Sequence, residues 1–284
     1  MEFNQALYNS RRRKNAAIMG FSMVASLIGL SILLWILYVL FSNGFYAIDW
    51  ALFSEDTPAP GTPGGGLRNA IVGSALMVGS AVLISTPIGI LAGIYLAEFG
   101  DASKVASVTR FVNEVMLSAP SVVLGLFVFA VVVMNMGHFS GYAGMVALSL
   151  IAIPVVIKTT ENMMRMIPGS LREAAFALGA PHWKVALTVV LRGARAGVIT
   201  GVMLALARIS GETAPLLFTA LNNQFFTLDM NGPMANLPVW IYHMAMSPFD
   251  NWNELAWGGA LLITLTVLAI NITARILFRE RVKV

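Results

Sequence analysis

Residues 16–41 read AAIMGFSMVASLIGLSILLWILYVLF, a stretch without a single charged residue. A helix of about 20 apolar residues is enough to cross the hydrocarbon core of a bilayer, which is roughly 30 Å thick. The apolar region of a secretory signal peptide is shorter, roughly 7–15 residues, and ends at a small-residue cleavage site. This stretch instead continues to an aromatic end at Phe41, Phe45 and Tyr46. We therefore predict an uncleaved membrane-spanning helix.

The composition of the whole chain agrees with that prediction. Of the 284 residues, 57% are hydrophobic and 11% are charged, and the mean hydropathy is +0.77. These values lie outside the range of soluble proteins and exclude a soluble enzyme, a DNA-binding domain and a disordered scaffold. The chain has no cysteine, so it has no disulfide, thiol nucleophile or cysteine-ligated metal.

Further apolar stretches of similar length recur along the chain. They predict spans at about 67–97, 111–136, 140–157, 196–221 and 255–278. With the first stretch these make six, so we expect an all-α integral membrane protein with six transmembrane helices, forming a single membrane domain over 1–284. An even number of spans places both termini on the same side of the membrane.

Lys and Arg residues gather in the connections on that side. They lie in the N-terminal segment 1–15, after the second span, in the loop 158–195 and in or near the tail 279–284. The segments 43–66 and 222–254 contain no Lys or Arg and hold several Asp and Glu. By the positive-inside rule, both termini and the 158–195 loop are cytoplasmic, and the segments 43–66 and 222–254 are periplasmic loops.

The cytoplasmic loop 158–195 contains the signature of a short helix. Ser170 and Glu173 match a capping box, which predicts a helix over 171–178. Gly179 follows where a left-handed residue is expected, and Pro181 suits the first turn of a second helix. The small residues Ala174 and Ala175 either pack this helix against its own spans or let another protein approach closely; periodicity alone leaves both alternatives open.

Two ionisable residues, Arg208 and Glu212, fall inside the predicted fifth span. Such residues cost about 2.5–3.5 kcal/mol each on insertion scales, so they need partners or a wet pathway. Their spacing puts them on one helix face with Gly197, Gly201 and Ala205, and we expect that stripe to face other helices or a cavity. One interpretation is a structural ion pair; the other is that the Arg208 guanidinium binds a tetrahedral oxyanion. The three histidines lie in different loops, without the spacing of a metal site.

Two groups of residues resemble a known family. Glu173-Ala174-Ala175, then Gly179, then the aliphatic residues Val189 and Leu191, are similar to the EAA loop of the permeases of binding-protein-dependent ABC importers. The chain has Leu191-Arg192 where the family commonly has Leu-Pro. The run Leu206–Ala220, with residues 236–239 and 246–249, is similar to the phosphate branch of that family, and the resemblance covers essentially the whole chain after the first span.

The resemblance implies a fold, a function and partners. The fold is that of a MetI-like type I ABC importer permease. The function is that of a non-catalytic subunit without cofactors that forms half of a phosphate pathway and couples, through Glu173, Ala174, Ala175 and Gly179, to a separate ATPase. The implied partners are two copies of an ATP-binding subunit, a second permease and a periplasmic phosphate-binding protein, in the bacterial inner membrane. The alternatives are an importer of another oxyanion and a secondary anion transporter or channel.

Overall fold

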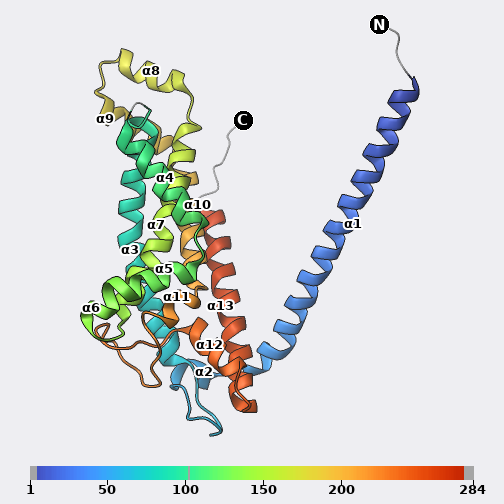
Figure 1. The fold of residues 1–284 in the computed structure, drawn as a ribbon, viewed down its shortest axis with the longest axis vertical. Helices are drawn as coiled ribbons and strands as arrows, with labels where there is room; N and C mark the ends of the chain where they lie inside the picture. Colours follow the sequence, from blue (N-terminus) through green and yellow to red (C-terminus); the bar gives the residue numbers. More distant parts are fainter. Residues whose placement is uncertain (1–4, 102, 278–284) are drawn as a thin grey trace.

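The computed structural model describes residues 5–101 and 103–277, and regular structure in these ranges is helical throughout (Figure 1). The longer helices are α1 (Gln5–Gly44), α3 (Arg68–Glu98), α4 (Lys104–Ser118), α5 (Ser121–Val128), α7 (Gly141–Arg165), α8 (Gly169–Ala177), α10 (Leu191–Ser210), α12 (Leu237–Ala245) and α13 (Asp250–Leu277). The shorter ones are α2 (Trp50–Ser54), α6 (Met134–Met136), α9 (His182–Val185) and α11 (Ala214–Leu217). Two π-helical segments, Phe129–Val133 and Ala186–Val190, join α5 to α6 and α9 to α10.

Five helical stretches are long and apolar enough to cross a membrane: α1, α3, α7, the continuous stretch His182–Ser210, and α13. Helix α4 and the stretch Ser121–Met136 are together long and apolar enough for a sixth span, but they meet at a bend of 108°. The expected all-helical, multi-span membrane fold is therefore confirmed, but the prediction of one straight span over 111–136 is wrong. Pro120 breaks that span, because proline lacks an N–H and disfavours helical backbone at the preceding residue; Ala119 is accordingly extended, with ψ 137°.

Other boundaries differ from the predicted ones in smaller ways. The first span begins at Gln5, so residues 5–15 of the predicted N-terminal segment are helical. The fourth span continues beyond residue 157 to Arg165, and the fifth ends at Ser210 rather than near 221. The predicted tail 279–284 lies outside the described residues.

The described ends of the chain and the 158–195 loop lie at one end of the molecule (Figure 1). The start of α1, the end of α13 and helices α8 and α9 are all found there, whereas α2, α12 and the long loops lie at the other end. This arrangement fits an even number of crossings. We call the first end the inner end, following the prediction from the Lys and Arg distribution.

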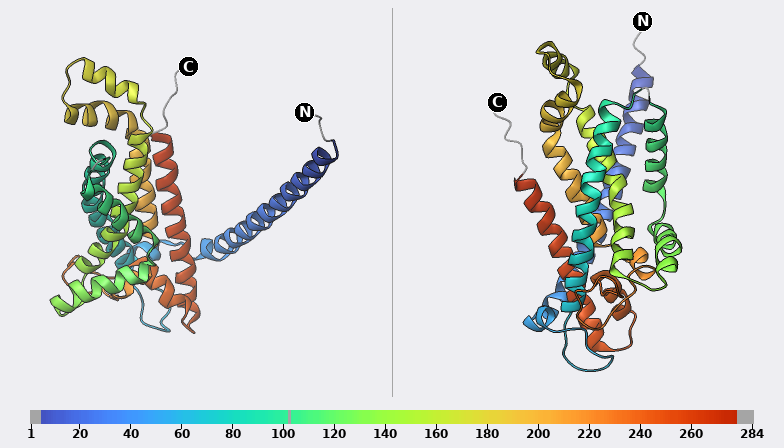
Figure 2. Two further views of the ribbon diagram at one scale, coloured as in Figure 1. Left: turned by 45° about the horizontal axis from the view of Figure 1, so that its top comes forward. Right: turned by 90° about the vertical axis from the view of Figure 1, so that its left-hand side faces the viewer.

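Helix α1 stands apart from the other spans, as the left view of Figure 2 shows. Its most apolar window is 0% buried, and it meets the bundle only near its outer end, where Gly44 lies against Trp257 and Leu261 of α13. The other helices of the chain therefore leave most of the apolar surface of α1 uncovered.

Helix α7 packs against both α3 and α10. On one face, Gly89 and Gly93 of α3 approach it so closely that an added Cβ would lie 2.6 Å from the Cβ of Val156 and of Thr160. On the neighbouring face, Gly197 and Gly201 of α10 lie against Met163 and Thr159. Small residues spaced four apart let membrane helices pack backbone to backbone, and here two such pairs hold one helix.

We predict that Gly93→Ala destabilises the protein, because its methyl group would push against Thr160 and the Ile157 carbonyl. The free energy of unfolding should fall by about 1–3 kcal/mol, as expected for overpacking. Gly79→Ala is the matched control on the same helix, because nothing lies within 4 Å of its added Cβ and alanine favours the helix. Thermal unfolding in detergent measures both. Equal transition temperatures for the two variants would contradict the packing described above.

Candidate functional site

Helix α8 is the element that the sequence placed over 171–178, and it begins earlier than predicted. The residue before its first turn is Pro168, and the Leu171 N–H already donates to the Pro168 carbonyl at 3.2 Å. Ser170 is therefore helical and does not act as the N-cap, which needs an extended backbone. The predicted capping box is wrong, while the helix itself is confirmed.

The end of α8 follows the prediction closely. Gly179 adopts the left-handed conformation, with φ +79°. Its N–H donates to the Phe176 carbonyl at 2.9 Å, and the Ala180 N–H donates to the Ala175 carbonyl at 3.2 Å. This pair of hydrogen bonds is a Schellman motif, in which two carbonyls at the helix end find donors. Pro181 then precedes α9 as its N-cap residue.

The two faces of α8 have different surroundings. Ala175 packs inward against a core cluster that includes Met164, Val185 and Ala186. Glu173 and Ala174 are exposed, together with the apolar side chains of Leu171 and Leu178, the latter with 89% of its surface accessible. The motif is thus divided, with one alanine facing the chain's own core and its neighbours facing outward. Exposed apolar side chains of this kind, beyond the end of the spans, are typical of a protein–protein contact.

Arg208 and Glu212 do not share a helix face as the sequence suggested. Arg208 is in the last turn of α10, which ends at Ser210, and Glu212 lies in the turn that follows. The cause is Pro215, which has no N–H for the Gly211 carbonyl and whose ring would collide with it in a continuous helix. The chain instead turns and begins the short helix α11.

The two charged side chains are nevertheless close to each other. Arg208 Nε lies 4.0 Å from Glu212 Oε1, which is longer than a hydrogen bond. The exposed fraction of the side chain is 41% for Arg208 and 15% for Glu212. The predicted stripe faces other helices as far as Ala205, which is buried, whereas the side chain of Arg208 is partly exposed.

At the outer end, the first turn of α3 contacts both long loops, 43–66 and 222–254. Asn69 is 3% exposed; its Oδ1 accepts from the N–H and hydroxyl of Thr57, and its Nδ2 donates to the carbonyls of Asn223 and Gln224. A single side chain therefore ties both predicted periplasmic loops to one span, with its hydrogen-bonding groups satisfied on both sides.

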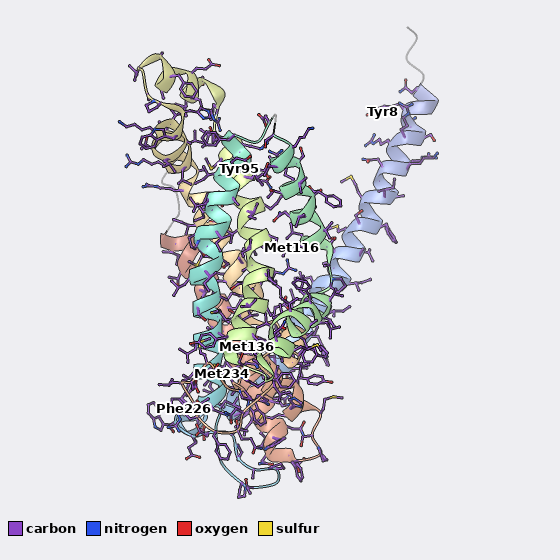
Figure 3. The ribbon with its side chains drawn as sticks, turned by 60° about the vertical axis from the view of Figure 1, so that its left-hand side comes forward. Tyr8, Tyr95, Met116, Met136, Phe226 and Met234 are labelled. Atoms are coloured by element: carbon purple, nitrogen blue, oxygen red, sulfur yellow. The ribbon has the colours of Figure 1, made fainter. Side chains whose placement is uncertain are left out.

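A second contact beside Asn69 joins the same loops. Arg68 Nε donates to Asp56 at 3.0 Å, and its guanidinium lies 4.8 Å from the centroid of the Phe226 ring. The other oxygen of Asp56 accepts from the Phe226 N–H. Figure 3 labels Phe226 and Met234 in this region, at the end of the bundle opposite Tyr95. The outer loops form one continuous surface rather than two separate connections.

Sequence reasoning missed the ion pairs at the inner end. Arg172 of α8 pairs with Glu98 of α3 at 2.7 Å, and Arg110 of α4 pairs with Glu161 of α7 at 2.8 Å. The two residues of each ion pair are far apart in the sequence, so no short motif predicts their contact. The described residues contain no group of three or more side chains able to hold a metal ion.

Comparisons with known proteins agree with this architecture. The model of the family described as "binding-protein-dependent transport system inner membrane component" matches residues 89–280. The chain is 56% identical to the "phosphate transport system permease protein PstA" of Pasteurella multocida, over 97% of this chain and 98% of the relative.

Two solved structures share the fold at low sequence identity. A bacterial alginate ABC transporter aligns with a TM-score of 0.68 and 13% identity, over 96% of this chain and 98% of its own. The MetNI methionine ABC transporter, in an inward-facing conformation, aligns with a TM-score of 0.62 and 18% identity, over 75% and 94%. The match to the family model and the relative at 56% identity show that this chain belongs to the family of inner membrane components of binding-protein-dependent transport systems.

Proposed function

We propose that this chain is the membrane-spanning subunit of an ATP-driven importer of inorganic phosphate, that it forms half of the pathway, and that ATP is hydrolysed by a separate subunit. The observation that carries the proposal is the 56% identity, over nearly the full length of both chains, to a relative named as a phosphate transport permease. The multi-span helical fold and the outward-facing surface of α8 support it.

Helix α8 is the proposed contact with the ATP-binding subunit. Glu173 and Ala174 are exposed on it, and Gly179 fixes where it ends. Ala175 anchors the helix to the core beneath. A short helix with a defined end and an inner anchor can move as a rigid body, which is what transmission of force from an ATPase requires.

The remaining partners are proposed from the resemblance and from the two surfaces that the fold leaves open. Two copies of the ATP-binding subunit would serve this chain and a second, related permease, which would cover the exposed face of Arg208. A periplasmic phosphate-binding protein would dock on the joined outer loops around Asn69 and Phe226. The assembly belongs in the bacterial inner membrane, with the basic loop 158–195 and both termini in the cytoplasm.

Arg208 and Glu212 are the proposed pathway residues. Their long separation of 4.0 Å and the 41% exposure of Arg208 leave the guanidinium donors available to a ligand. A guanidinium suits the geometry of a tetrahedral oxyanion, and the nearby Glu212 carboxylate balances its charge when no anion is present. The opposing interpretation, a structural pair, demands a tighter and more buried contact than the one observed.

The end of α8 provides the first test. Gly179→Val should lower phosphate uptake sharply, because a β-branched residue at φ +79° is strained by about 1–2 kcal/mol and shifts the end of the helix. Gly179→Asn is the matched control, since asparagine is of similar size and tolerates the left-handed conformation. No atom lies within 4 Å of an added Cβ, so crowding does not separate the two variants. If valine and asparagine left uptake and substrate-stimulated ATP hydrolysis equally intact, α8 would not be the coupling element.

The charge pair provides the second test. Arg208→Gln should abolish uptake of radiolabelled phosphate while membrane abundance stays near the wild-type level, because the side chain is partly exposed and loosely paired. The double variant Arg208→Gln, Glu212→Gln should also reach the membrane and also fail to transport. Near-normal uptake in the double variant would show that Arg208 matters only for charge balance. Competition of wild-type uptake by sulfate or molybdate separates a phosphate importer from one for another oxyanion.

A further inference from the structure

The inner end of α3 carries a buried carboxylate. Glu98 is the last residue of that helix, and its side chain is only 3% exposed. A negative charge at the C-terminal end of a helix is unfavourable, and a buried one is costly unless it is paired. Glu98 therefore depends on its partner, which is Arg172 of α8.

The contact between the two residues uses two donors of the guanidinium. Arg172 Nη2 donates to Glu98 Oε1 at 2.7 Å, and Arg172 Nε donates to the same oxygen at 3.1 Å and to Oε2 at 3.3 Å. The Arg172 side chain is itself only 19% exposed. Charge-assisted hydrogen bonds of this geometry are short and directional, so they fix an orientation as well as a distance.

The same guanidinium also reaches α7. Arg172 Nη1 donates to the Ile167 carbonyl at 2.6 Å, and Nη2 donates to the Met164 carbonyl at 2.9 Å. The Met164 carbonyl belongs to the last turn of α7, where carbonyls lack a partner within the helix, and the Ile167 carbonyl belongs to the turn that follows. One side chain of α8 thus holds the ends of α3 and α7 together through the several N–H donors of its planar guanidinium.

An aromatic contact leads to the same point on α3. Phe176 of α8 stacks on His182, with ring centroids 5.5 Å apart, and His182 meets Phe99 at 4.6 Å. Phe99 follows Glu98 directly. Helix α8 is therefore attached to the end of α3 at two points on one face, by charge through Arg172 and by packing of Phe176 on His182.

Another ion-pair cluster lies close by and does not involve α8. Arg110 and Arg165 both contact Glu161, and Arg165 also contacts Asp101. Both arginines donate to the Leu96 carbonyl. This cluster joins α3, α4 and α7 to one another at the inner end, separately from the contacts that α8 makes.

From these contacts we propose that Arg172 is a positioning residue that transmits the movement of α8 to α3 and α7. The proposal rests on the proposed function, in which α8 contacts an ATP-binding subunit. Because α3 and α7 are packed at backbone distance through Gly89 and Gly93, a displacement at their inner ends moves them together. The exposed surface of α8 binds the ATP-binding subunit. Arg172 faces away from that surface and transmits the movement of α8 to α3 and α7.

The test compares Arg172→Gln and Arg172→Lys with Arg165→Gln. Arg165 is the matched control, because it is an arginine at the same end, paired to Asp101 and Glu161 but not to α8. The chain has no cysteine, so spin labels at Leu178→Cys on the loop after α8 and Leu91→Cys on α3, both exposed, report the distance between the two segments. The distance between the labels is measured on the full chain in nanodiscs. Phosphate uptake and ATP hydrolysis are measured on the complex of the chain with its ATP-binding subunit.

We expect Arg172→Gln to broaden the distance distribution while the ATP-binding subunit still copurifies. Phosphate uptake and the stimulation of ATP hydrolysis by the loaded binding protein should fall at least about fivefold, the size of a typical coupling between sites. Arg172→Lys keeps the charge but lacks the planar guanidinium, so its values should lie between those of Arg172→Gln and the wild type. Arg165→Gln should match the wild type in the distance distribution, phosphate uptake and ATP hydrolysis.

An unchanged distance distribution in Arg172→Gln would overturn the proposal, and so would unchanged phosphate uptake in that variant. Loss of the ATP-binding subunit from the complex of that variant would also overturn it, because Arg172 would then be part of the docking surface. A failure of the proposed function looks different. In that case no ATP-binding subunit copurifies even with the wild-type chain, while the distance measurement, which needs no partner, still decides whether Arg172 holds α8 on α3.

Discussion

The close packing of α7 against α3 and α10 determines where the other helices of the bundle lie. Lipid tails are as apolar as the side chains they touch, so helices in a bilayer are held by close approach rather than by the hydrophobic effect. Glycines of α3 and α10 provide that approach on two neighbouring faces of α7. The position of α7 in turn fixes that of α8, which follows it after a short turn through Pro168. It also fixes the position of α10, which has Arg208 near its C-terminal end.

Two proline breaks place non-helical backbone within the spans. Pro120 separates α4 from α5, and Pro215 ends α10, and the two breaks meet where Gly125 of α5 lies against Pro215. Backbone of this kind is tolerated in a membrane only where protein covers it or where it lines a wet cavity. Glu212 lies three residues before Pro215, in the turn that this second break creates.

The membrane fold could be predicted from the sequence because the thickness of a bilayer sets the length of a span. The left-handed Gly179 was predictable for a similar reason, since few residues other than glycine adopt that conformation at a helix end. The predicted capping box at Ser170 is wrong because the helix already begins after Pro168. The predicted shared helix face of Arg208 and Glu212 is wrong because Pro215 has no N–H for the Gly211 carbonyl, so α10 ends at Ser210. The pairing of Arg172 with Glu98 joins residues 74 positions apart, and nothing in a single sequence links them.

Transport in proteoliposomes that contain the chain with its permease and ATP-binding partners would show whether this chain carries phosphate in an ATP-driven importer. Radiolabelled phosphate is supplied outside with the binding protein, and ATP is enclosed within. We expect accumulation of phosphate against its gradient that requires both the enclosed ATP and the binding protein. Phosphate flux that runs only down its gradient and proceeds without ATP would rule out such an importer and identify a channel or a secondary transporter instead.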